Sequence, residues 1–533
     1  MSLANTLKQL LQEQDKRKAE LVPVSHETQH LPDKGDTPRN RALSLILAGK
    51  SIIISGEAGT GKSTLIVDAV EMLLKTRKYS IHLYKVRGQG HYPEPGLACI
   101  AFTNTAKNIL RDKLHQSEYI KGKLDAAITT INMLLEYIPD GQGYRPEKDS
   151  EHPLECDTII IDEGSLVGDY LETALFDAMK QGTQLIIVGD LCQIPPVFGQ
   201  SMIHRLLSRL PVIHLTEVYR QGEHNPLLDE ARNVLKGIPP KQNLNVDDPS
   251  KPLGLYIPDT FKRIKDEEIA LERYTSWIKN AYDKGVYNPM SDIIICPFRT
   301  PKRYISCHRI NAYLADYINK ESPVYEIIFN RDRFYFAVGD IVFVYKEQAV
   351  IVNIEENNFY VGEVPHEPSN RLNHLGQFDG LDREEEFKFS AGGELDEWEE
   401  NEKDISYQSL SHIITVQFKS GETVKLNKFQ DIHQGEIVLG YSTTGHKSQG
   451  GQWKRSIIVL HECHNILMNR EWLYTSMTRS EELTTILIDK PKRLEQWVKI
   501  TEIPGFTFED KVRSLRKRYA REEIDLTKLG DTI

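Results

Sequence analysis

Short, continuous apolar runs recur through the first 230 residues and are separated by longer polar and amphipathic stretches. The runs are rich in β-branched side chains, which is typical of strands buried on both faces of a parallel sheet. Apolar positions between them recur at helical spacing, as in 64–75 and 37–47. The alternation of buried strands with amphipathic helices predicts an α/β domain. The predicted strands are 51–55, 97–102, 158–163 and 184–188.

The pattern changes after residue 333, where short alternating runs are separated by turn residues. Such spacing predicts an all-β module. The predicted strands of this module are 334–344, 358–364, 411–418 and 422–426. At the other end of the chain, residues 1–35 read as an amphipathic helix that runs into a polar linker.

Composition places the chain among globular proteins of several domains. It has 533 residues, 40% of them hydrophobic and 27% charged, which fits about three to four domains. No run of about 18 apolar residues predicts a membrane span, and Met1–Glu20 has no secretory pattern. Six scattered cysteines favour a reducing compartment. We therefore expect a cytoplasmic protein with no membrane partner.

The net charge of −11 is concentrated in one acidic stretch. Eleven acids and three bases between Asp382 and Asp404 give this stretch a charge of −8, which leaves −3 for the rest of the chain. A local basic channel for nucleic acid is therefore compatible with the composition. The acidic loop, about 380–404, reads as a solvated loop, with a DNA-mimicking or partner-docking element as the alternative.

Residues 56–63 read GEAGTGKS and fit the phosphate-binding loop G-x-x-x-x-G-K-[ST]. The loop follows a predicted buried strand and precedes a predicted helix, which is the context that the motif requires. Its backbone N–H groups and the helix N-terminus would bind phosphate oxygens. Lys62 would reach the β- and γ-phosphates, and Ser63 would hold Mg²⁺. The predicted nucleotide-binding residues here are Gly56, Glu57, Ala58, Gly59, Thr60, Gly61, Lys62, Ser63 and Thr64.

Polar residues end the other predicted strands. Asp162 and Glu163 follow 158–161, where Asp162 is placed to hold Mg²⁺ and Glu163 to polarise the attacking water. Gln193 follows 184–188 and is placed to contact the γ-phosphate. Thr103 and Asn104 follow 97–102, at the sheet edge where α/β proteins bind ligands.

Six segments in this order resemble the successive motifs of superfamily 1 helicases of the RecD and Dda type. They are 56–63, 162–163, 189–197, 215–221, 441–450 and 474–480. The resemblance covers most of the chain. It departs from the family at Asn132, where the family commonly has histidine, and at 38–42, which lacks the glutamine that reads adenine and offers Asn40 instead.

The resemblance implies an α/β fold with two RecA-like parallel-sheet P-loop motor domains, an inserted SH3-like β-barrel and a small β-hairpin pin insertion. The expected divisions are an extension, 1–35; a first motor, 36–230, with the pin at about 136–156; a second motor, 231–333 and 441–533; and the barrel, 334–440. ATP would bind between the motors.

The same resemblance assigns further residues to the two ligands. Arg220 and Arg479 match the arginines that reach the γ-phosphate, although Arg220 taken singly reads as a surface arginine, and Gly450 matches a nucleotide-binding position. The implied contacts to single-stranded nucleic acid are Thr103, Asn104, Thr130, Phe298, Arg299, Thr444 and His446. Phe298 reads equally well as a core residue after the strand 292–296.

Asp140-Gly141 between short potential strands predicts a hairpin. In the helicases that the chain resembles, a hairpin here splits the duplex, and Tyr137 or Tyr144 would stack on the last base pair; a plain surface loop is the alternative. Residues 461–464 read HECH and look like metal ligands, but no second ligand pair accompanies them, so a metal site is the less favoured interpretation.

The resemblance, together with the phosphate loop, implies an ATP- and Mg²⁺-dependent DNA helicase that moves 5′ to 3′ on single-stranded DNA and acts at junctions of single- and double-stranded DNA. A compact motor of this kind is compatible with a bacterial or phage-infected cell. We expect a monomer that serves DNA replication, repair or recombination alongside proteins of those pathways. The alternatives are an RNA helicase or translocase, and an ATP-switched DNA-binding motor subunit of a larger recombination or nuclease complex. The motifs do not read the 2′-hydroxyl that would separate DNA from RNA.

Overall fold

A computed structural model describes most of residues 36–529. The gaps are 78, 80, 87–89, 103, 122–127, 140–143, 197–198, 217–224, 245–253, 259–264, 301, 330–331, 345–346, 359, 361–408, 429–436, 523 and 525. The predictions for the extension 1–35, the acidic loop 380–404, Thr103 and Arg220 lie outside the described residues.

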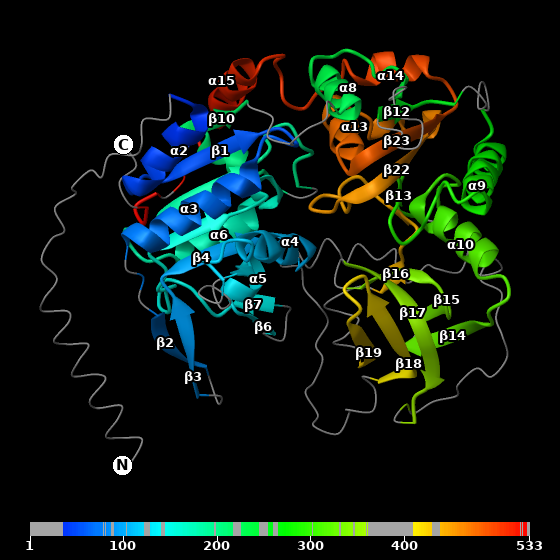
Figure 1. Ribbon diagram of the computed structural model, residues 1–533, viewed down its shortest axis with the longest axis horizontal. Helices are drawn as coiled ribbons and strands as arrows, with labels where there is room; N and C mark the ends of the chain where they lie inside the picture. Colours follow the sequence, from blue (N-terminus) through cyan, green and yellow to red (C-terminus); the bar gives the residue numbers. More distant parts are fainter. Residues whose placement is uncertain are drawn as a thin grey trace, which may run out of the picture.

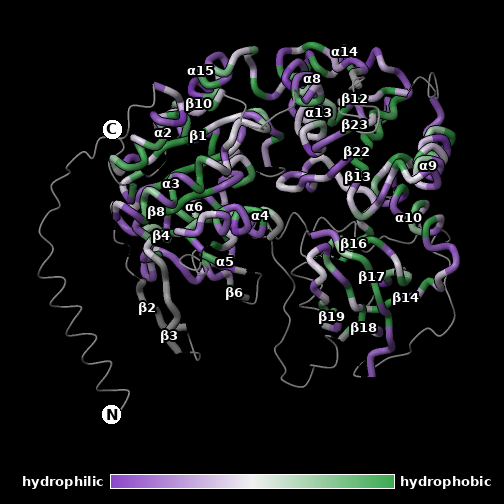
Figure 2. Tube along the Cα trace, in the orientation of Figure 1, coloured by the Kyte–Doolittle hydropathy of each residue, from purple (hydrophilic) through white to green (hydrophobic). Residues whose placement is uncertain are grey.

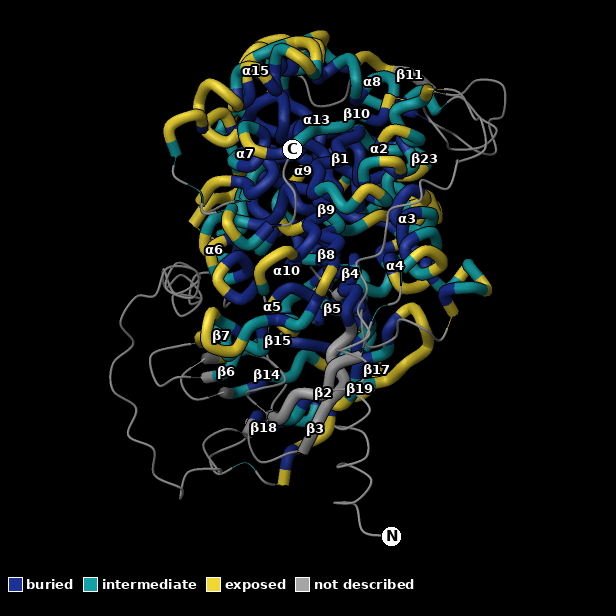
Figure 3. The backbone as a smooth tube through the Cα atoms, turned by 90° about the vertical axis from the view of Figure 1, so that its left-hand side faces the viewer, coloured by how far each residue is buried: buried dark blue, intermediate teal, exposed yellow. Residues whose placement is uncertain are grey.

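The first of two large sheets is six-stranded and parallel throughout. Its order is β10 (Val212–Leu215), β1 (Ile52–Gly56), β9 (Gln184–Gly189), β8 (Thr158–Ile161), β4 (Leu97–Ala101) and β5 (Ile128–Thr130). The apolar runs at 51–55, 97–102, 158–161 and 184–188 form the central strands, whose residues are buried in Figure 3. The parallel-sheet α/β fold predicted for this region is therefore confirmed.

Helices cover both faces of the first sheet (Figure 1). One face packs against α2 (Pro38–Leu47), α3 (Lys62–Thr76) and α4 (Asn104–Leu114). The other packs against α5 (Ile131–Leu134), α6 (Asp169–Ala178), α7 (Met202–Leu206) and α15 (Phe508–Tyr519), with the 3₁₀ helix η2 (Gly164–Leu166) beside it. Figure 2 shows the apolar strands enclosed by helices with polar outer sides, as a sheet buried on both faces requires.

The second large sheet is also six-stranded and mostly parallel. Its order is β11 (Asn243–Leu244), β12 (Gly254–Tyr256), β23 (Ser480–Ile488), β22 (Trp453–Leu460), β13 (Ile293–Ile295) and β21 (Ser442–Thr443), and only the β11–β12 pair is antiparallel. The helices α8 (Pro226–Leu235), α13 (Arg470–Met477) and α14 (Lys492–Trp497) cover one face. The helices α9 (Glu267–Asp283) and α10 (Cys307–Ile318) cover the other.

An all-β module lies between β13 and β21 in the sequence. It contains the hairpin β14 (Val324–Phe329) and β15 (Asp332–Ala337), and an antiparallel sheet ordered β19 (Thr423–Lys428), β18 (Ser409–Phe418), β17 (Glu347–Glu356), β16 (Ile341–Val344) and β20 (Val438–Leu439). These strands share one apolar core. The all-β prediction is confirmed, and the assignment as an SH3-like barrel stays a prediction.

One strand of this module was predicted wrongly and another was missed. The run 334–344 is two strands, because Gly339 turns the chain with a φ of +96° and Asp340 accepts a hydrogen bond from the Ala337 N–H at 2.8 Å. The long strand β17 was not predicted, and the strand expected at 358–364 lies largely outside the described residues.

Two hairpins project from the first sheet's layer. The pair β6 (Tyr137–Pro139) and β7 (Tyr144–Pro146) confirms the hairpin predicted around Asp140-Gly141. The pair β2 (Ile81–Val86) and β3 (Gly90–Pro95) was not predicted.

The end of the chain returns to the first sheet, so the assignment of all of 441–533 to the second motor is wrong. Ile503, Val512, Leu515 and Tyr519 belong to the apolar core beneath the first sheet. Figure 1 shows α15 beside β10, away from α14. The physical reason is the amphipathic pattern of α15, whose apolar side packs against α7.

Among the helices of the described residues, none is both long and apolar enough to cross a membrane.

Candidate active site

The phosphate loop joins the end of β1 to the start of α3. Gly59 and Gly61 have φ angles of +85° and +76°, which glycine adopts without strain. The Lys62 Nζ lies 2.8 Å from the Gly56 carbonyl oxygen and 3.2 Å from that of Glu57, and it donates to both. The loop therefore holds its own lysine over the turn where the motif expects phosphate.

The two acids predicted at the end of β8 lie beside this loop. Asp162 accepts a hydrogen bond from the Glu163 N–H at 3.0 Å. Burial and the neighbouring Glu163 charge raise the pKa of Asp162 to about 6, against the opposing effect of Lys62. Glu163 has a φ of +54°, a strained conformation for a residue with a side chain. Such strain persists where the surroundings fix a residue for a task.

One carboxylate oxygen after β8 and one amide oxygen after β9 are buried without a hydrogen-bond partner among the described residues. They are Glu163 Oε2 and Gln193 Oε1. Gln193 lies just after β9 and is 3% exposed. Because unpaired buried acceptors are costly, these two oxygens indicate a site that a further group completes.

Ser63 and Asp162 are the residues that could hold a divalent cation, since hydroxyl and carboxylate oxygens are the ligands that Mg²⁺ prefers. Their donor set and the unpaired oxygens nearby fit such an ion. The Ser63 Oγ accepts a hydrogen bond from Lys113 Nζ at 3.0 Å. Lys113 lies near the end of α4 and was not singled out from the sequence.

Arg479 reaches the same region from the second sheet's layer. It follows α13 and is 5% exposed, and its Nε donates to the Thr475 carbonyl oxygen at 3.0 Å. Its positive charge acts favourably on Glu163 of the first sheet. The guanidinium predicted as an arginine finger is therefore near the predicted catalytic acid.

Side chains of the second layer contact the first layer directly at the phosphate loop. The Tyr474 hydroxyl accepts from the Ala58 N–H at 3.1 Å and donates to Asp190 Oδ2 at 2.6 Å. Arg232 Nε donates to Glu57 Oε2 at 2.8 Å. These contacts join the two layers around the predicted nucleotide site.

A second group of contacts joins the layers beside Gln193. The Ile194 N–H donates to Thr475 Oγ1 at 3.0 Å, and Gln449 Nε2 donates to the Ile194 carbonyl oxygen at 2.7 Å. The segment after β9 is therefore held by both α13 and the loop that contains Gly450. A change in the distance between the layers would move Gln193 with it.

The residues predicted to contact nucleic acid are spread over both layers. Asn104 begins α4, and its side chain is outside the described set. Thr130 is buried and caps α5, because its Oγ1 accepts from the Met133 N–H at 3.3 Å. Thr444 and His446 follow β21, and Thr444 Oγ1 accepts from the Lys447 N–H at 3.3 Å. Burial lowers the pKa of His446.

Phe298 and Arg299 follow β13 and are half-buried. The Phe298 ring meets His464 edge-on, with centroids 5.0 Å apart, and the Arg303 guanidinium lies 5.3 Å from its centroid. These contacts favour the interpretation of Phe298 as a packed residue, whose ring is partly covered by its own neighbours.

The two pin candidates differ in what the structure describes. Tyr137 packs against the core of the first sheet with its hydroxyl oxygen buried, and burial raises its pKa. A ring held in this way is not free to stack on a base pair, so Tyr137 is a poor pin residue. The Tyr144 side chain lies outside the described set.

The HECH sequence has a structural explanation. Residues 462–466 form a 3₁₀ helix in which His461 accepts from the Cys463 N–H at 3.3 Å and His464 Nδ1 accepts from the His461 N–H at 3.1 Å. Among the described residues no cluster of three or more histidine, cysteine or acidic side chains is arranged to hold a metal. The pair of histidines closes a turn.

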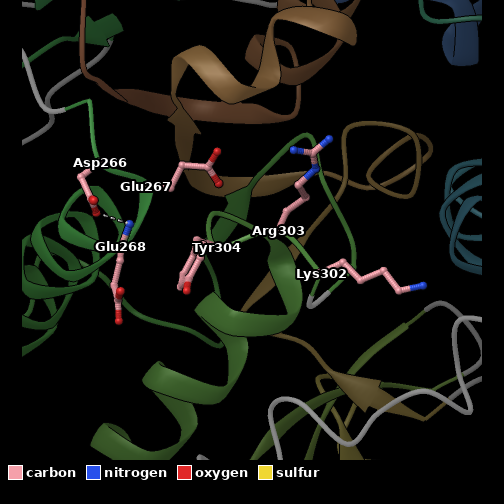
Figure 4. Close-up of a pocket in the computed structure, with 6 residues that line it drawn as sticks. All are labelled: Asp266, Glu267, Glu268, Lys302, Arg303 and Tyr304. Atoms are coloured by element: carbon pink, nitrogen blue, oxygen red, sulfur yellow. Dashed lines mark hydrogen bonds between the residues drawn. The ribbon is translucent and has the colours of Figure 1, made fainter.

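An open pocket of about 380 Å³ lies at the start of α9. Figure 4 shows Asp266, Glu267 and Glu268 on one side and Lys302 and Arg303 extending on the other, with Tyr304 between them. It shares no residue with the phosphate-loop site, and its three acids oppose phosphate binding.

Sequence reasoning missed three residues of this site: Lys113, Arg232 and the role of Tyr474. Tyr474 lies within the sixth recognised segment, which was the signal available for it. Lys113 and Arg232 lie on ordinary amphipathic helices, where no local pattern distinguishes them from surface cations.

Comparison with known proteins gives two family matches. The family described as AAA domain matches residues 39–199, and the family described as UvrD-like helicase C-terminal domain matches residues 439–487. The first match contains the phosphate loop and both acids, and the second contains Gly450 and Arg479. The two matches fall on the two sheets that meet at the site.

The chain is also similar to individual proteins. The ATP-dependent RecD2 DNA helicase of Deinococcus radiodurans is 26% identical over 66% of this chain and 39% of that protein. The RecBCD enzyme subunit RecD of Buchnera aphidicola subsp. Schizaphis graminum is 22% identical over 84% of this chain and 72% of that protein. The chain thus spans less than half of the first relative. A solved structure of Bacteroides Pif1 helicase in complex with ADP-AlF3 and ssDNA aligns with 90% of this chain and 96% of that one at 18% identity and a TM-score of 0.45.

Proposed function

We propose that this chain, which sequence similarity places with the RecD-type helicases of superfamily 1, is an ATP-dependent DNA helicase that moves 5′ to 3′ on single-stranded DNA. The observation that carries the proposal is the pair of unpaired buried oxygens, Glu163 Oε2 and Gln193 Oε1. Glu163 lies two residues beyond β8 and Gln193 four residues beyond β9, and the Arg479 charge reaches Glu163 from the opposite layer. Water, which can donate a hydrogen bond to each oxygen, would satisfy them, and the Gln193 side-chain N–H would be left to donate to the γ-phosphate.

In this mechanism each side chain of the site has a separate task. Lys62 would leave the Gly56 and Glu57 carbonyl oxygens to contact the β- and γ-phosphates, and Ser63 and Asp162 would hold Mg²⁺, which supplies positive charge to the phosphate oxygens. Glu163 would take a proton from the attacking water. Gln193, Arg220 and Arg479 would contact the γ-phosphate, where the arginines neutralise developing charge.

Hydrolysis would be coupled to movement because the site has two halves. Arg479 and Tyr474 belong to the second layer, and Lys62, Asp162 and Glu163 belong to the first. Contacts that form only when the layers approach make the catalytic step depend on closure. Release of phosphate would then allow the layers to separate again.

In this proposal, single-stranded DNA is bound by the segments that follow three of the strands. Thr103 follows β4 and Asn104 is the first residue of α4, the loop after β13 carries Phe298 and Arg299, and the loop after β21 carries Thr444 and His446. Because these segments come from both layers, opening and closing would let them hold the backbone alternately. Contacts to the phosphate backbone carry no sequence information, as a translocating motor requires.

The remaining assignments belong to the same proposal. The all-β module would be an SH3-like barrel, and β6–β7 would be a pin that meets the junction of single- and double-stranded DNA, with Tyr144 as its candidate residue. The protein would act as a monomer and serve replication, repair or recombination.

The test is ATP hydrolysis with and without nucleic acid. We expect single-stranded DNA to stimulate the wild-type rate and Lys62→Ala to abolish it, because the phosphates lose their lysine. Equal or greater stimulation by RNA of the same sequence would favour the RNA-translocase alternative. Wild-type turnover in Lys62→Ala would overturn the site, and DNA binding that responds to ATP without turnover would favour an ATP-switched subunit.

A further inference from the structure

Lys113 contacts the hydroxyl of Ser63, which is a predicted Mg²⁺ ligand. Lys113 Nζ lies 3.0 Å from Ser63 Oγ and donates a hydrogen bond to it. The Lys113 charge also acts favourably on Asp162, the other predicted metal ligand. One ammonium therefore interacts with both groups that would hold Mg²⁺, which is what a resident counter-ion does.

The backbone that carries Lys113 is fixed, whereas its side chain is half-exposed. Leu110 and Leu114 on either side of it are buried in the core that α4 shares with α3. After the helix, Ser117 Oγ donates to Glu71 Oε2 of α3 at 2.8 Å. Withdrawal of the ammonium from Ser63 therefore requires side-chain rotation and leaves the helix in place.

We propose that Lys113 is the counter-ion of the metal site when Mg²⁺ and nucleotide are absent, and that Mg²⁺ displaces it. The proposal rests on the proposed function, which makes Ser63 and Asp162 metal ligands. Mg²⁺ binds oxygen at about 2.0–2.1 Å and needs a lone pair of the Ser63 hydroxyl. An ammonium and a divalent cation on the same oxygen repel each other, so the two compete.

This competition gives Lys113 two opposite effects on nucleotide binding. With Mg²⁺ present, the ammonium must be displaced, which weakens the binding of the Mg²⁺-nucleotide complex. Without Mg²⁺, the ammonium supplies positive charge beside the phosphates, which strengthens the binding of free nucleotide. Both effects reduce the dependence of nucleotide affinity on Mg²⁺. The residue is a positioning residue for the cation site and takes no part in bond making.

The experiment measures the Kd of a fluorescent ADP analogue, mant-ADP, in EDTA and in saturating Mg²⁺. The quantity compared is the Kd in EDTA divided by the Kd in Mg²⁺. For Lys113→Met we expect this ratio to rise by about fivefold or more, the low end of ordinary coupling between two ligands. Lys113→Arg keeps the charge and should restore a ratio close to that of the wild type. Lys121→Met removes an exposed charge just beyond the same helix and should leave the ratio unchanged.

Each outcome has a distinct meaning. A wild-type ratio in Lys113→Met, with mant-ADP still bound, would overturn the counter-ion role. Failure of mant-ADP to bind the wild type, or equal binding by Lys62→Ala, would overturn the nucleotide site on which the role rests. Circular dichroism checks the fold of each variant, and Lys113→Gln replaces the methionine variant if that one unfolds. Mn²⁺ binding followed by electron paramagnetic resonance, with ADP present, should strengthen in the same neutral variants.

Discussion

Arg232 and Glu57 form an ion pair that joins the two layers, with Arg232 Nε 2.8 Å from Glu57 Oε2. Glu57 is the second residue of the phosphate loop, and Arg232 lies on α8 over the second sheet. Both side chains are mostly shielded, at 23% and 28% exposed. The pair therefore ties the turn that would hold phosphate to the layer that would move against it.

Loss of this pair should release nucleotide faster. We expect Arg232→Met to raise the dissociation rate of mant-ADP by about two- to fivefold, because a partly exposed ion pair contributes up to about 1 kcal/mol. Stopped-flow fluorescence measures the rate, and Arg273→Met, an exposed arginine of α9, is the matched control. A double-mutant cycle with Glu57→Gln should show that the two substitutions are not additive. Additive effects would mean that the pair does not couple the layers.

The second prediction concerns the Tyr474 hydroxyl. In Tyr474→Phe the Ala58 N–H loses its acceptor and the buried Asp190 Oδ2 loses a donor. We expect a loss of about 1–3 kcal/mol in the free energy of unfolding and weaker nucleotide binding, because an unpaired buried acceptor is costly. Tyr274→Phe is the control, since its hydroxyl donates to the Leu460 carbonyl oxygen at 2.9 Å within the second layer. Equal nucleotide affinities in the two variants would contradict a role at the phosphate loop.

Glu163→Gln should separate binding from hydrolysis. Glutamine keeps the size of the side chain but cannot take a proton from water, so kcat should fall by about 10²- to 10⁴-fold while ATP still binds. Steady-state ATPase and mant-ATP binding measure the two properties. The exposed Glu151 provides a control substitution, Glu151→Gln, that should change neither. Near-normal turnover in Glu163→Gln would assign the proton acceptor to another group.

The burial of Glu172 predicts that the stability of the protein depends on pH. It is 2% exposed, and burial raises its pKa to about 7 from an ordinary value of 4.5, against the attraction of Arg205 3.1 Å away; Asp169 and Glu522 add to the rise. The folded protein therefore holds this proton more tightly than the unfolded chain does. Its contribution to stability is full below pH 4.5, falls as pH rises toward 7 and is lost above 7.

Glu172→Gln cannot ionise and should remove that dependence. The free energy of unfolding of the variant, relative to the wild type, should rise by up to about 3 kcal/mol between pH 4.5 and pH 8. Urea unfolding at several pH values measures the difference. A difference that stays constant with pH would show that Glu172 does not titrate in this range.

The local patterns predicted the first layer well because each of its central strands is a continuous apolar run. Residues 51–55 and 184–188 became β1 and β9 within one residue at each end. The phosphate loop is equally local, since its glycines and lysine are contiguous. A local pattern misled where it has two uses: 334–344 reads as one strand, yet Gly339 divides it.

Tertiary placement accounts for what the sequence did not reveal. The amphipathic pattern of α15 shows that one side is buried but not against which sheet, so its return to the first layer was missed. Lys113 and Arg232 reach the site only because two helices lie where the fold places them. Spacing along the chain carries no information about such distances, and the same holds for the link between Tyr474 and Ala58, which are 416 residues apart.

Strand separation on tailed duplexes tests the central claim most directly. The substrates are two DNA duplexes of one sequence that carry a single-stranded tail at either the 5′ or the 3′ end, each incubated with ATP and Mg²⁺ and wild-type protein or Glu163→Gln. We predict that the wild type opens the 5′-tailed duplex alone and that Glu163→Gln opens neither. Opening of the 3′-tailed duplex alone would contradict the direction of movement, and opening by Glu163→Gln would contradict the coupling of hydrolysis to unwinding.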